Sequence, residues 1–339
     1  MALVEANANS QSKSGPLVFL FNGDADGLIA QHILELKLGA PDLRITGPKR
    51  DIKLLKKLPP LDSGRIHILD ISLRQNQPEL PALLAKEGLN LTWYDHHDPG
   101  DTAAHPRLHL HIHQSPGTCT AAIVNAVYGR QHSLWAAMAA FGDTVPDTAK
   151  ALIAEVGATP SDSALLRRCG ILLNYNAYGE KISDLLFDPA DLAKRISGFT
   201  SALDFCHEES IFGPLGVQFA SDQAHCQGLV ALADSAFACA YLAPDEPWAR
   251  RFLATWANER ILMHPQQALA LIHPIADGNF QVSIRAPRRS DRVVPSAADL
   301  AAEFSGGGGR KLAAGINVLA AQDLQRFVNR FEMFFIEGG

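Results

Sequence analysis

Short apolar runs alternate with longer amphipathic segments in the first part of the chain. The run Leu-Val-Phe-Leu-Phe at 17–21 has the length and apolarity of a buried strand, and residues 28–38 repeat their apolar positions at the spacing of one helix face. Further strands are predicted at 65–71, 89–97 and 107–113, and a further helix at 120–128. Residues 134–144 are predicted as a buried helix or an apolar segment that runs into a turn. This alternation predicts an α/β fold with a mostly parallel sheet flanked by helices.

The pattern changes in the second half of the chain. Residues 151–235 contain helical stretches, few strand signals and polar breaks, which predicts a helical connector. A new pattern follows, with strands predicted at 237–242, 268–275 and 279–285 and helices at 248–263, 296–304 and 321–335. Asp277 and Gly278 are expected to form the hairpin turn between the last two strands. The predicted parts are a disordered leader at 1–15, the α/β domain at 16–150, the connector at 151–235 and a smaller α+β domain at 236–339.

Composition and charge narrow the class of protein. The chain has 339 residues, of which 47% are hydrophobic, so two domains with sizeable cores are expected. Its formal net charge is −6 and its isoelectric point is about 6.1. These values argue against the broad basic surface of a protein that binds long duplex DNA. An anionic substrate must therefore be met by local basic groups.

The cysteines and the amino terminus favour a cytoplasmic protein. The five cysteines are scattered and include no Cys-x-x-Cys pair, which favours reduced thiols over disulfides or structural zinc. Residues 1–15 are polar and lack the basic start and apolar centre of a signal peptide. No apolar stretch has the length of a membrane span. The pattern does not indicate an oligomeric state, and a homodimer is left open.

Acidic and imidazole side chains gather at the ends of the predicted strands. They are Asp24, Asp26, Asp70, Asp95, His96 and His97. In a parallel sheet the carboxyl ends of the strands meet at one edge, where ligands bind. Buried carboxylates need a positive partner, which the residues next to Asp24 and Asp26 do not provide. Asp143, in a Gly-Asp-Thr turn, is a further candidate.

Each motif also has a structural interpretation. The Asp-Ala-Asp-Gly sequence is typical of a surface turn, Asp70 could cap a helix, and Asp143 could begin a turn. An Asp-His-His triplet at a strand end is rarer, and the motifs together favour function. Carboxylates and imidazoles without thiolates suit manganese better than magnesium or zinc. Two ions about 3.5–4 Å apart, with a shared carboxylate, can clamp the attacking and leaving oxygens of a phosphoryl transfer.

A second motif lies at 305–315, where the sequence reads Ser-Gly-Gly-Gly-Gly-Arg-Lys-Leu-Ala-Ala-Gly. Consecutive glycines allow backbone N–H groups to approach a phosphate closely. A flexible linker is the alternative interpretation. The segment that follows directly indicates ordered structure, which disfavours a linker.

From about Leu17 onward, the chain resembles the DHH phosphoesterase superfamily, which includes RecJ-type single-strand exonucleases, oligoribonucleases, cyclic-dinucleotide phosphodiesterases and family II pyrophosphatases. The triplet Asp95, His96 and His97 is one of the two most specific points of the resemblance. The other is the segment at 305–315, which resembles the Gly-Gly-Gly-His-x-x-Ala-Ala-Gly motif of the DHH-associated domain. We therefore expect the metals in the first domain, the substrate-binding residues in the last, and a cleft between them.

The resemblance implies a role for each motif residue. It implies a site for two manganese ions, with magnesium as the alternative, ligated by Asp24, Asp26, Asp70, His96, Asp143 and Asn22. Asp70 would bridge the ions, His97 would face the substrate phosphate, and Asp95 would orient a neighbouring imidazole. The implied substrate-binding residues are Gly307, Gly308, Gly309, Arg310 and Arg285, and Arg310 would act with His97 on the developing charge.

Three residues depart from the family pattern. Leu20 stands where many members have a histidine, Asn22 where RecJ-type members have an aspartate, and Arg310 where the second motif has a histidine. The oxygen of Asn22 lacks the charge of a carboxylate, so we expect weaker retention of one ion. Arg310 would bind phosphate but could not donate a proton near neutral pH.

These expectations describe a hydrolase. We expect it to cleave phosphodiester bonds of short single-stranded oligonucleotides or (cyclic) dinucleotides, in the manner of an exonuclease, with a water activated by the two ions. One alternative is a phosphoanhydride hydrolase that acts on pyrophosphate or polyphosphate. The other is a nucleotide-binding sensor without catalysis, motivated by Leu20, Asn22 and Arg310.

Overall fold

The computed structural model describes residues 15–115, 117–288 and 294–337. The leader predicted at 1–15 lies outside the described residues, apart from Gly15. The chain divides into two compact units, residues 1–213 and 214–339, and each is described by itself. In the described part of the chain, no helix combines the length and apolarity needed to cross a membrane.

The first unit alternates strands and helices and then continues as helices. Its strands are β1 (Leu17–Phe21), β2 (Leu43–Ile45), β3 (Ser63–Leu69), β4 (Gly88–Asp95) and β5 (Leu108–Ile112). Its helices are α1 (Ala25–Leu38), α2 (Leu73–Asn76), α3 (Leu80–Leu84), α4 (Thr120–Val127), α5 (Ser133–Gly142), α6 (Pro146–Val156), α7 (Pro160–Ala177), α8 (Pro189–Ile196) and α9 (Ala202–Glu208). Short 3-10 turns are η1 (Leu54–Lys57), η2 (Gln77–Glu79) and η3 (Ile182–Asp184). The predicted α/β fold is confirmed.

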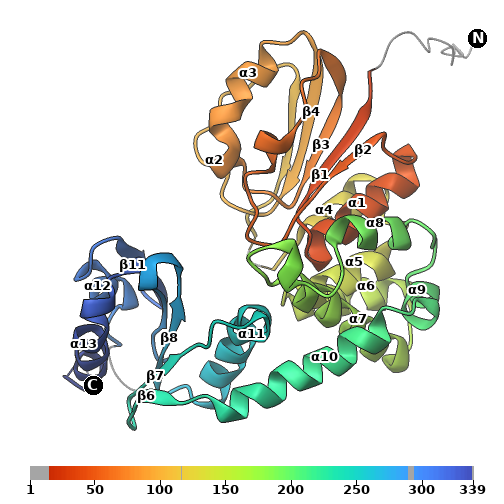
Figure 1. Ribbon diagram of the computed structural model, residues 1–339. Coiled ribbons are helices and arrows are strands. Elements are labelled where there is room, and N and C mark those ends of the chain that lie inside the picture. The colour runs from red at the N-terminus through yellow and green to blue at the C-terminus, as the bar shows by residue number, and fades with distance from the viewer. Residues whose placement is uncertain (1–14, 116, 289–293, 338–339) are drawn as a thin grey trace, which may run out of the picture. The chain divides into compact units, whose positions relative to one another are not determined.

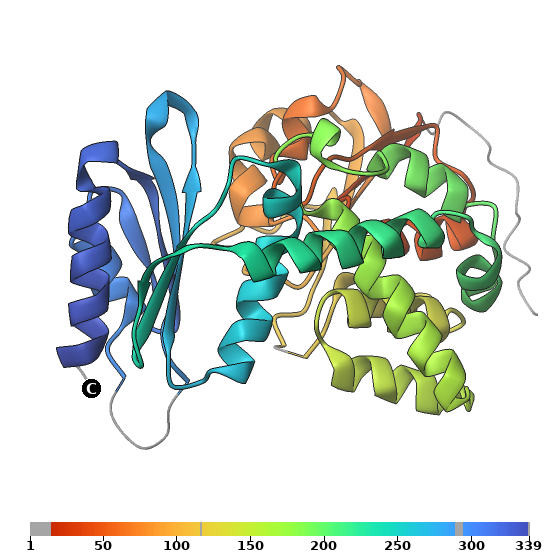
Figure 2. The same cartoon turned by 60° about the horizontal axis from the view of Figure 1, so that its bottom comes forward.

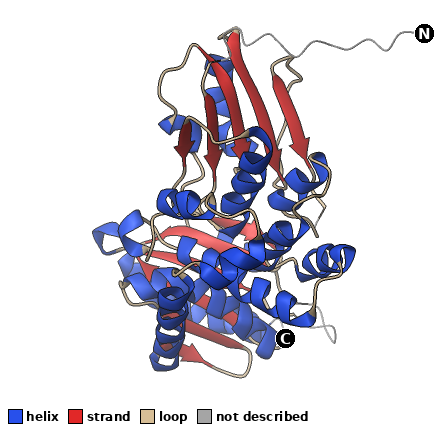
Figure 3. Ribbon diagram, turned by 90° about the vertical axis from the view of Figure 1, so that its right-hand side faces the viewer, coloured by secondary structure: helices blue, strands red, loops and turns tan. Residues whose placement is uncertain are grey.

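The strands in the sheet of the first unit all run in the same direction (Figure 3). Their order is β2-β1-β3-β4-β5. β1 pairs with β3 from Leu17↔Arg65 to Phe21↔Leu69, and β3 pairs with β4 up to Leu69↔Tyr94. Because these three strands end side by side, the residues that follow them share one edge of the sheet. The sequence pattern does not predict β2, which has three residues.

The two faces of this sheet pack against different helices. On β1, Val18 and Leu20 belong to a core with leucines of η1, α2 and α3, including Leu54, Leu73 and Leu80. Helices α1 and α4 cover the other face, as Figure 1 shows. Burial on both faces explains why the strands are apolar runs in the sequence.

The helices that follow the sheet form a tightly packed group. α5 contacts α1, α6 and α7. A Cβ atom at Gly142 would lie 2.6 Å from the Cβ of Ala25 in α1 and 2.8 Å from the carbonyl oxygen of Gly170 in α7. The close approach of these three helices therefore requires a glycine at the end of α5. The packing of α5 against α1 and α7 therefore fixes the position of Asp143, the C-cap residue of α5.

The second unit is smaller and has a mixed sheet. Its strands are β6 (Ala231–Asp234), β7 (Ala238–Leu242), β8 (Ala268–Pro274), β9 (Phe280–Arg285), β10 (Gly307–Arg310) and β11 (Ala313–Leu319). Its helices are α10 (Phe212–His225), which begins just before the unit boundary, α11 (Pro247–Met263), α12 (Ala297–Ala302) and α13 (Leu324–Glu337), with 3-10 turns η4 (Cys226–Gly228), η5 (Ala276–Gly278) and η6 (Ala321–Asp323). The strand order is β10-β11-β9-β8-β7-β6. Only the β7–β8 pair is parallel.

One face of this second sheet packs against α12 and α13, and α11 lies on the other face (Figure 2). Asp277 and Gly278 have φ angles of 62° and 72° between the antiparallel strands β8 and β9, so the predicted turn is present. The sequence pattern does not predict β6, β10 or β11. The glycine cluster of the second motif forms the edge strand β10, which pairs with β11.

Candidate metal site

The loop between β1 and α1 positions the first two acidic residues. Asp24 is the N-cap of α1, and its Oδ1 accepts hydrogen bonds from the backbone N–H groups of Asp26 and Gly27, both at 3.0 Å. A Cβ at residue 27 would lie 2.1 Å from the carbonyl oxygen of Asn22, so this turn requires a glycine. The helix therefore begins at Ala25. The predicted start at residue 28 is wrong, because the first turn contains polar residues and the prediction relied on the spacing of apolar residues alone.

The carboxylate of Asp26 points to the start of α4. It accepts hydrogen bonds from the backbone N–H groups of Thr120 (2.7 Å) and Ala121 (2.8 Å). Uncapped N–H groups at a helix start favour a negative charge. These bonds join α1 to α4 and hold the side chain of Asp26 beneath the carboxyl edge of the sheet.

Asp70 follows β3 in a left-handed backbone conformation, with φ at 56°. Its N–H donates to the carbonyl oxygen of Tyr94 in β4 (3.0 Å), and its Oδ1 accepts from the hydroxyl of Thr120 (3.2 Å). Aspartate enters this backbone region more readily than most residues. The turn after β3 therefore directs a buried carboxylate into the site.

The Asp-His-His triplet ends β4. Asp95 is fully buried, and its Oδ1 accepts from the N–H of His96 (2.8 Å) and lies 2.7 Å from Nδ1 of His97. This contact places the Nδ1 proton of His97 toward Asp95. Oδ2 of Asp95 is buried and has no hydrogen-bond partner among the described residues.

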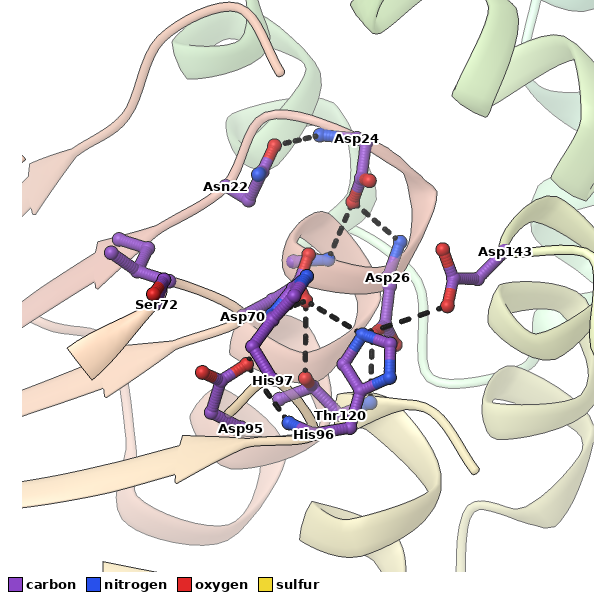
Figure 4. A network of polar contacts seen from close by, with 12 residues as sticks. Asn22, Asp24, Asp26, Asp70, Ser72, Asp95, His96, His97, Thr120 and Asp143 are labelled. Carbon is purple, nitrogen blue, oxygen red and sulfur yellow. Dashed lines mark hydrogen bonds and ion pairs between the residues drawn. The ribbon is translucent and has the colours of Figure 1, made fainter. Parts of the chain in front are cut away.

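The candidate ligands form two groups that share His96 (Figure 4). Asp70, Asp95, His96 and His97 form the first group, and Asp26, His96 and Asp143 form the second. Nε2 of His96 lies 3.5 Å from Oδ1 of Asp70 and 3.6 Å from Oδ2 of Asp143. Asp26, His96 and Asp143 each offer one ligand atom, and these atoms lie within 4.8 Å of one another. The convergence joins segments that follow β1, β3, β4 and α5.

The crowded carboxylates have perturbed pKa values. Burial, together with the charges of the neighbouring acids, raises the pKa of Asp26, Asp70 and Asp143 to about 7. Burial alone would lower the pKa of His96, but its hydrogen bond to Asp70 and the nearby acids raise it to about 10. Ionising these buried carboxyls together is unfavourable, and a bound cation would favour their ionised forms. Three carboxylates and one imidazole form a donor set that fits a divalent ion such as Mn²⁺ or Mg²⁺.

Asp24 and Asn22 lie beside this group, and their side chains have other partners. Nζ of Lys49, in the loop after β2, lies 2.5 Å from Oδ2 of Asp24 and 3.7 Å from Oδ1 of Asp143. Burial acts to raise the pKa of Asp24, but the Lys49 ammonium outweighs it and holds that pKa below its ordinary value. The side chain of Asn22 bonds to the N–H of Asp24 and to the carbonyl oxygen of Lys49.

A pocket of about 310 Å³ opens next to these residues in the first unit. Its lining includes Lys49, Ser72, Gln75 and His97 together with Asp70. Sequence reasoning identified His97 and Asp70 but missed Lys49, Ser72 and Gln75. Ser72 and Gln75 follow Asp70 closely in the sequence, so they could have been considered, whereas no motif marks Lys49.

The substrate-binding residues implied by the second motif belong to the second unit. In β10, a Cβ at Gly307 would lie 1.9 Å from the carbonyl oxygen of Ala301, and Gly309 has a φ angle of 147°. The fold of the second unit therefore requires glycine at both positions, whether or not they bind phosphate. Arg310 is exposed, and Nη1 of Arg285 donates to the hydroxyl of Ser283 (2.9 Å). Their role in substrate binding stays a prediction.

Neither protein-family models nor curated proteins match this chain. Solved structures do match it. An exonuclease RecJ bound to manganese is 18% identical, with a TM-score of 0.60 over 95% of this chain and 90% of that one. A DHH domain from a member of a family of ribosomal proteins is 14% identical, with a TM-score of 0.57 over 94% of this chain and 86% of that one. A pGpG-specific phosphodiesterase from Vibrio cholerae is 13% identical, with a TM-score of 0.55 over 95% of this chain and 100% of that one.

These likenesses extend over nearly the whole chain at low sequence identity, and therefore concern the fold. The chain has the fold of the DHH superfamily, with a five-stranded parallel sheet and a second, smaller sheet toward its carboxyl terminus.

Proposed function

We propose that this chain is a metal-dependent phosphoesterase that hydrolyses phosphodiester bonds of short single-stranded oligonucleotides or (cyclic) dinucleotides. One observation carries the proposal: Asp26, Asp70, His96 and Asp143 converge at the carboxyl edge of the sheet, beside a pocket. The fold is shared with an exonuclease and with a pGpG-specific phosphodiesterase. Mn²⁺ is the proposed ion and Mg²⁺ the alternative.

The chemistry divides between the ion and the protein. A divalent ion at this site would supply positive charge to the phosphoryl group and to the attacking water. His97 lines the pocket, and its hydrogen bond to Asp95 raises its pKa, which favours the protonated ring. A protonated His97 held in this way can donate its second ring proton to a phosphoryl oxygen. Lys49 adds a fixed positive charge on the same pocket wall.

The proposed substrate class rests on charge and on the second motif. The net charge of −6 disfavours long duplex DNA. We include Arg310, Arg285 and the glycines at 307–309 as proposed phosphate contacts, because a guanidinium group binds phosphate through two parallel hydrogen bonds. The described residues do not support the homodimer that the sequence left open, and the proposal concerns one chain.

The test compares pApA, a cyclic dinucleotide, single-stranded DNA and pyrophosphate side by side, with Mn²⁺, with Mg²⁺ and with EDTA. We expect Mn²⁺-dependent release of mononucleotide from at least one phosphodiester. We expect Asp143→Asn to reduce this rate at least about 100-fold, because it removes a charged ligand. Asp62→Asn is the matched control, because Asp62 is exposed in the same unit. If none of the phosphodiesters is cleaved, the proposal is wrong, and faster cleavage of pyrophosphate would favour a phosphoanhydride hydrolase.

The second candidate is a nucleotide-binding sensor without catalysis. The contact between Lys49 and Asp24 favours it, because this contact occupies a carboxylate that the two-ion prediction assigns to metal. A sensor would bind pApA with the same affinity in EDTA as in Mn²⁺ and would release no product. Binding that requires the metal, together with turnover, would exclude this candidate.

A further inference from the structure

We propose that Lys49 replaces one of the two metal ions expected at this site, so that the chain holds a single divalent ion and the Lys49 ammonium supplies the second positive charge. The inference rests on the proposed function, because it concerns the same site. It differs from the sequence prediction in the number of ions and in the roles of Asp24 and Asn22.

The ammonium group of Lys49 is surrounded by groups that suit a cation. Nζ lies 2.5 Å from Oδ2 of Asp24, 3.7 Å from Oδ1 of Asp143 and 3.5 Å from Oδ1 of Asn174. It also lies 5.4 Å from the ring centroid of Tyr178. The Lys49 ammonium is thus surrounded by two carboxylates, an amide oxygen and an aromatic face, all of which stabilise a positive charge.

The backbone of Lys49 is held independently of these acids. Its N–H donates to the carbonyl oxygen of Ala177 at the end of α7 (3.0 Å), and its carbonyl oxygen accepts from Nδ2 of Asn22 (3.4 Å). Hydrogen bonds thus connect the loop after β2 to α7 and to Asn22, in the loop between β1 and α1. Lys49 therefore does not reach Asp24 merely through a flexible side chain on a free loop.

The residues that the two-ion prediction places around Asp24 have other roles, and Asp95 and His97 of the first ligand group contact each other at 2.7 Å. Leu20 is apolar and fully buried in the core of the sheet. Asn22 uses its side-chain oxygen on the N–H of Asp24 (3.2 Å) and its amide nitrogen on Lys49. Asp24 uses one oxygen to cap α1 and the other on Lys49. A divalent ion bound by Asp24 would have to displace an ammonium group of the same sign of charge.

The remaining ligands suffice for one ion. Asp26, His96 and Asp143 form one ligand group, and Oδ1 of Asp70 lies 3.5 Å from Nε2 of His96. Asp143 contacts Lys49 through Oδ1 at 3.7 Å and presents its other oxygen, Oδ2, to His96. An ammonium group can bind and orient a phosphoryl oxygen, but it cannot ligate and activate a water as a metal ion does. The inferred site thus has one group that activates water and one that holds the substrate.

The test is the Mn²⁺ stoichiometry of the full chain, measured by isothermal titration calorimetry and by electron paramagnetic resonance. We expect one equivalent per chain and the six-line spectrum of an isolated Mn²⁺ ion. Two equivalents with an exchange-coupled spectrum would overturn the inference and leave the proposed function standing. Absence of Mn²⁺ binding would overturn both.

Two matched variants separate the roles of the acids. Asp24→Asn should change the Mn²⁺ dissociation constant less than about tenfold, because asparagine still caps a helix and Asp24 is not a ligand in this assignment. Asp143→Asn should raise it at least about 100-fold. Circular dichroism and thermal melting of the metal-free variants check that both fold. An equal loss of Mn²⁺ affinity in the two variants would contradict the role given to Lys49.

Discussion

Asp70 illustrates how single residues build the site. It adopts a left-handed backbone, is almost completely buried and receives a hydrogen bond from Thr120. Such a conformation is unfavourable for most side chains and is often found at functional sites. Burial and neighbouring acids raise its pKa to about 7, so the metal-free protein holds this carboxylate in an unfavourable environment.

The first prediction concerns the substitution Asp70→Asn. Asparagine tolerates the same backbone and keeps the size of the side chain, but it removes a charge that the ion needs. We expect kcat/KM to fall at least about 100-fold, or about 2.7 kcal/mol of transition-state stabilisation. We expect the free energy of unfolding of the metal-free protein at pH 8 to rise or stay constant, because a crowded carboxylate is removed.

Steady-state assays and urea denaturation in EDTA check the two parts of this prediction. Retention of activity within about threefold would remove Asp70 from the ligand set. A loss of activity accompanied by a loss of stability would instead indicate a structural role.

The sequence identified most of the site acids because they lie at or just after the ends of apolar strands, as Asp95 and Asp70 do. It did not identify Lys49, which comes from a loop after β2, a strand of only three residues. The segment Gly-Pro-Lys-Arg around Lys49 has the composition of an ordinary surface loop. Its partners Asp24 and Asn174 are 25 and 125 residues away, and no local pattern encodes contacts at such separations.

At the level of elements, hydrophobic periodicity located most strands and helices but not their polar boundaries. α1 begins at Ala25 because Asp24 caps it, a signal that capping rules could have supplied. β10 was missed because glycine has a low strand propensity, and its pairing with β11 depends on the close approach of Gly307 to α12. Both errors occur where hydrogen bonding and close backbone contact, rather than apolar spacing, determine the element.

The second prediction concerns His32 in α1, which packs against Trp135 of α5 at a ring-centroid distance of 4.4 Å. Burial lowers the pKa of His32 to about 4, whereas an unfolded chain protonates histidine near pH 6.5. Between these pH values the unfolded state binds more protons, so the contribution of His32 to stability falls as the pH decreases. From pH 7.5 to pH 5 this contribution should decrease by about 2 kcal/mol.

Urea denaturation of the metal-free protein at both pH values, compared with the variant His32→Gln, measures this contribution. The comparison cancels the opposite pH dependence of Asp26, Asp70 and Asp143, whose raised pKa values favour the folded state at low pH. The variant should lose less stability than the original chain on acidification. Identical pH dependence in the two proteins would show that His32 is not held neutral by burial.

At the scale of the whole molecule, the candidate site and the second motif lie in different compact units. All the expected metal ligands fall between Asn22 and Asp143, and Arg310 lies in the second unit. The sequence predicted the parallel sheet and the smaller sheet domain because each has its own pattern of apolar residues. A contact between Arg310 and a substrate bound at the candidate site would join residues of both units. No local sequence pattern encodes such a contact.

The last prediction tests whether the second unit contributes to substrate binding. We expect Arg310→Ala to raise the dissociation constant of pApA about tenfold, measured with Ca²⁺ in place of Mn²⁺ to slow turnover. Arg310→Lys should recover only part of the loss, because an ammonium group lacks the paired donors of guanidinium. Lys311→Ala is the matched control, since Lys311 is the adjacent exposed cation.

Hydrogen exchange of the full chain should show that the metal protects residues 20–28 and 93–97, whereas pApA additionally protects 307–315. If pApA leaves 307–315 unprotected and Arg310→Ala binds it as tightly as Lys311→Ala does, the glycine-rich motif serves the fold of β10 and the phosphate contacts lie in the pocket beside Lys49 and His97.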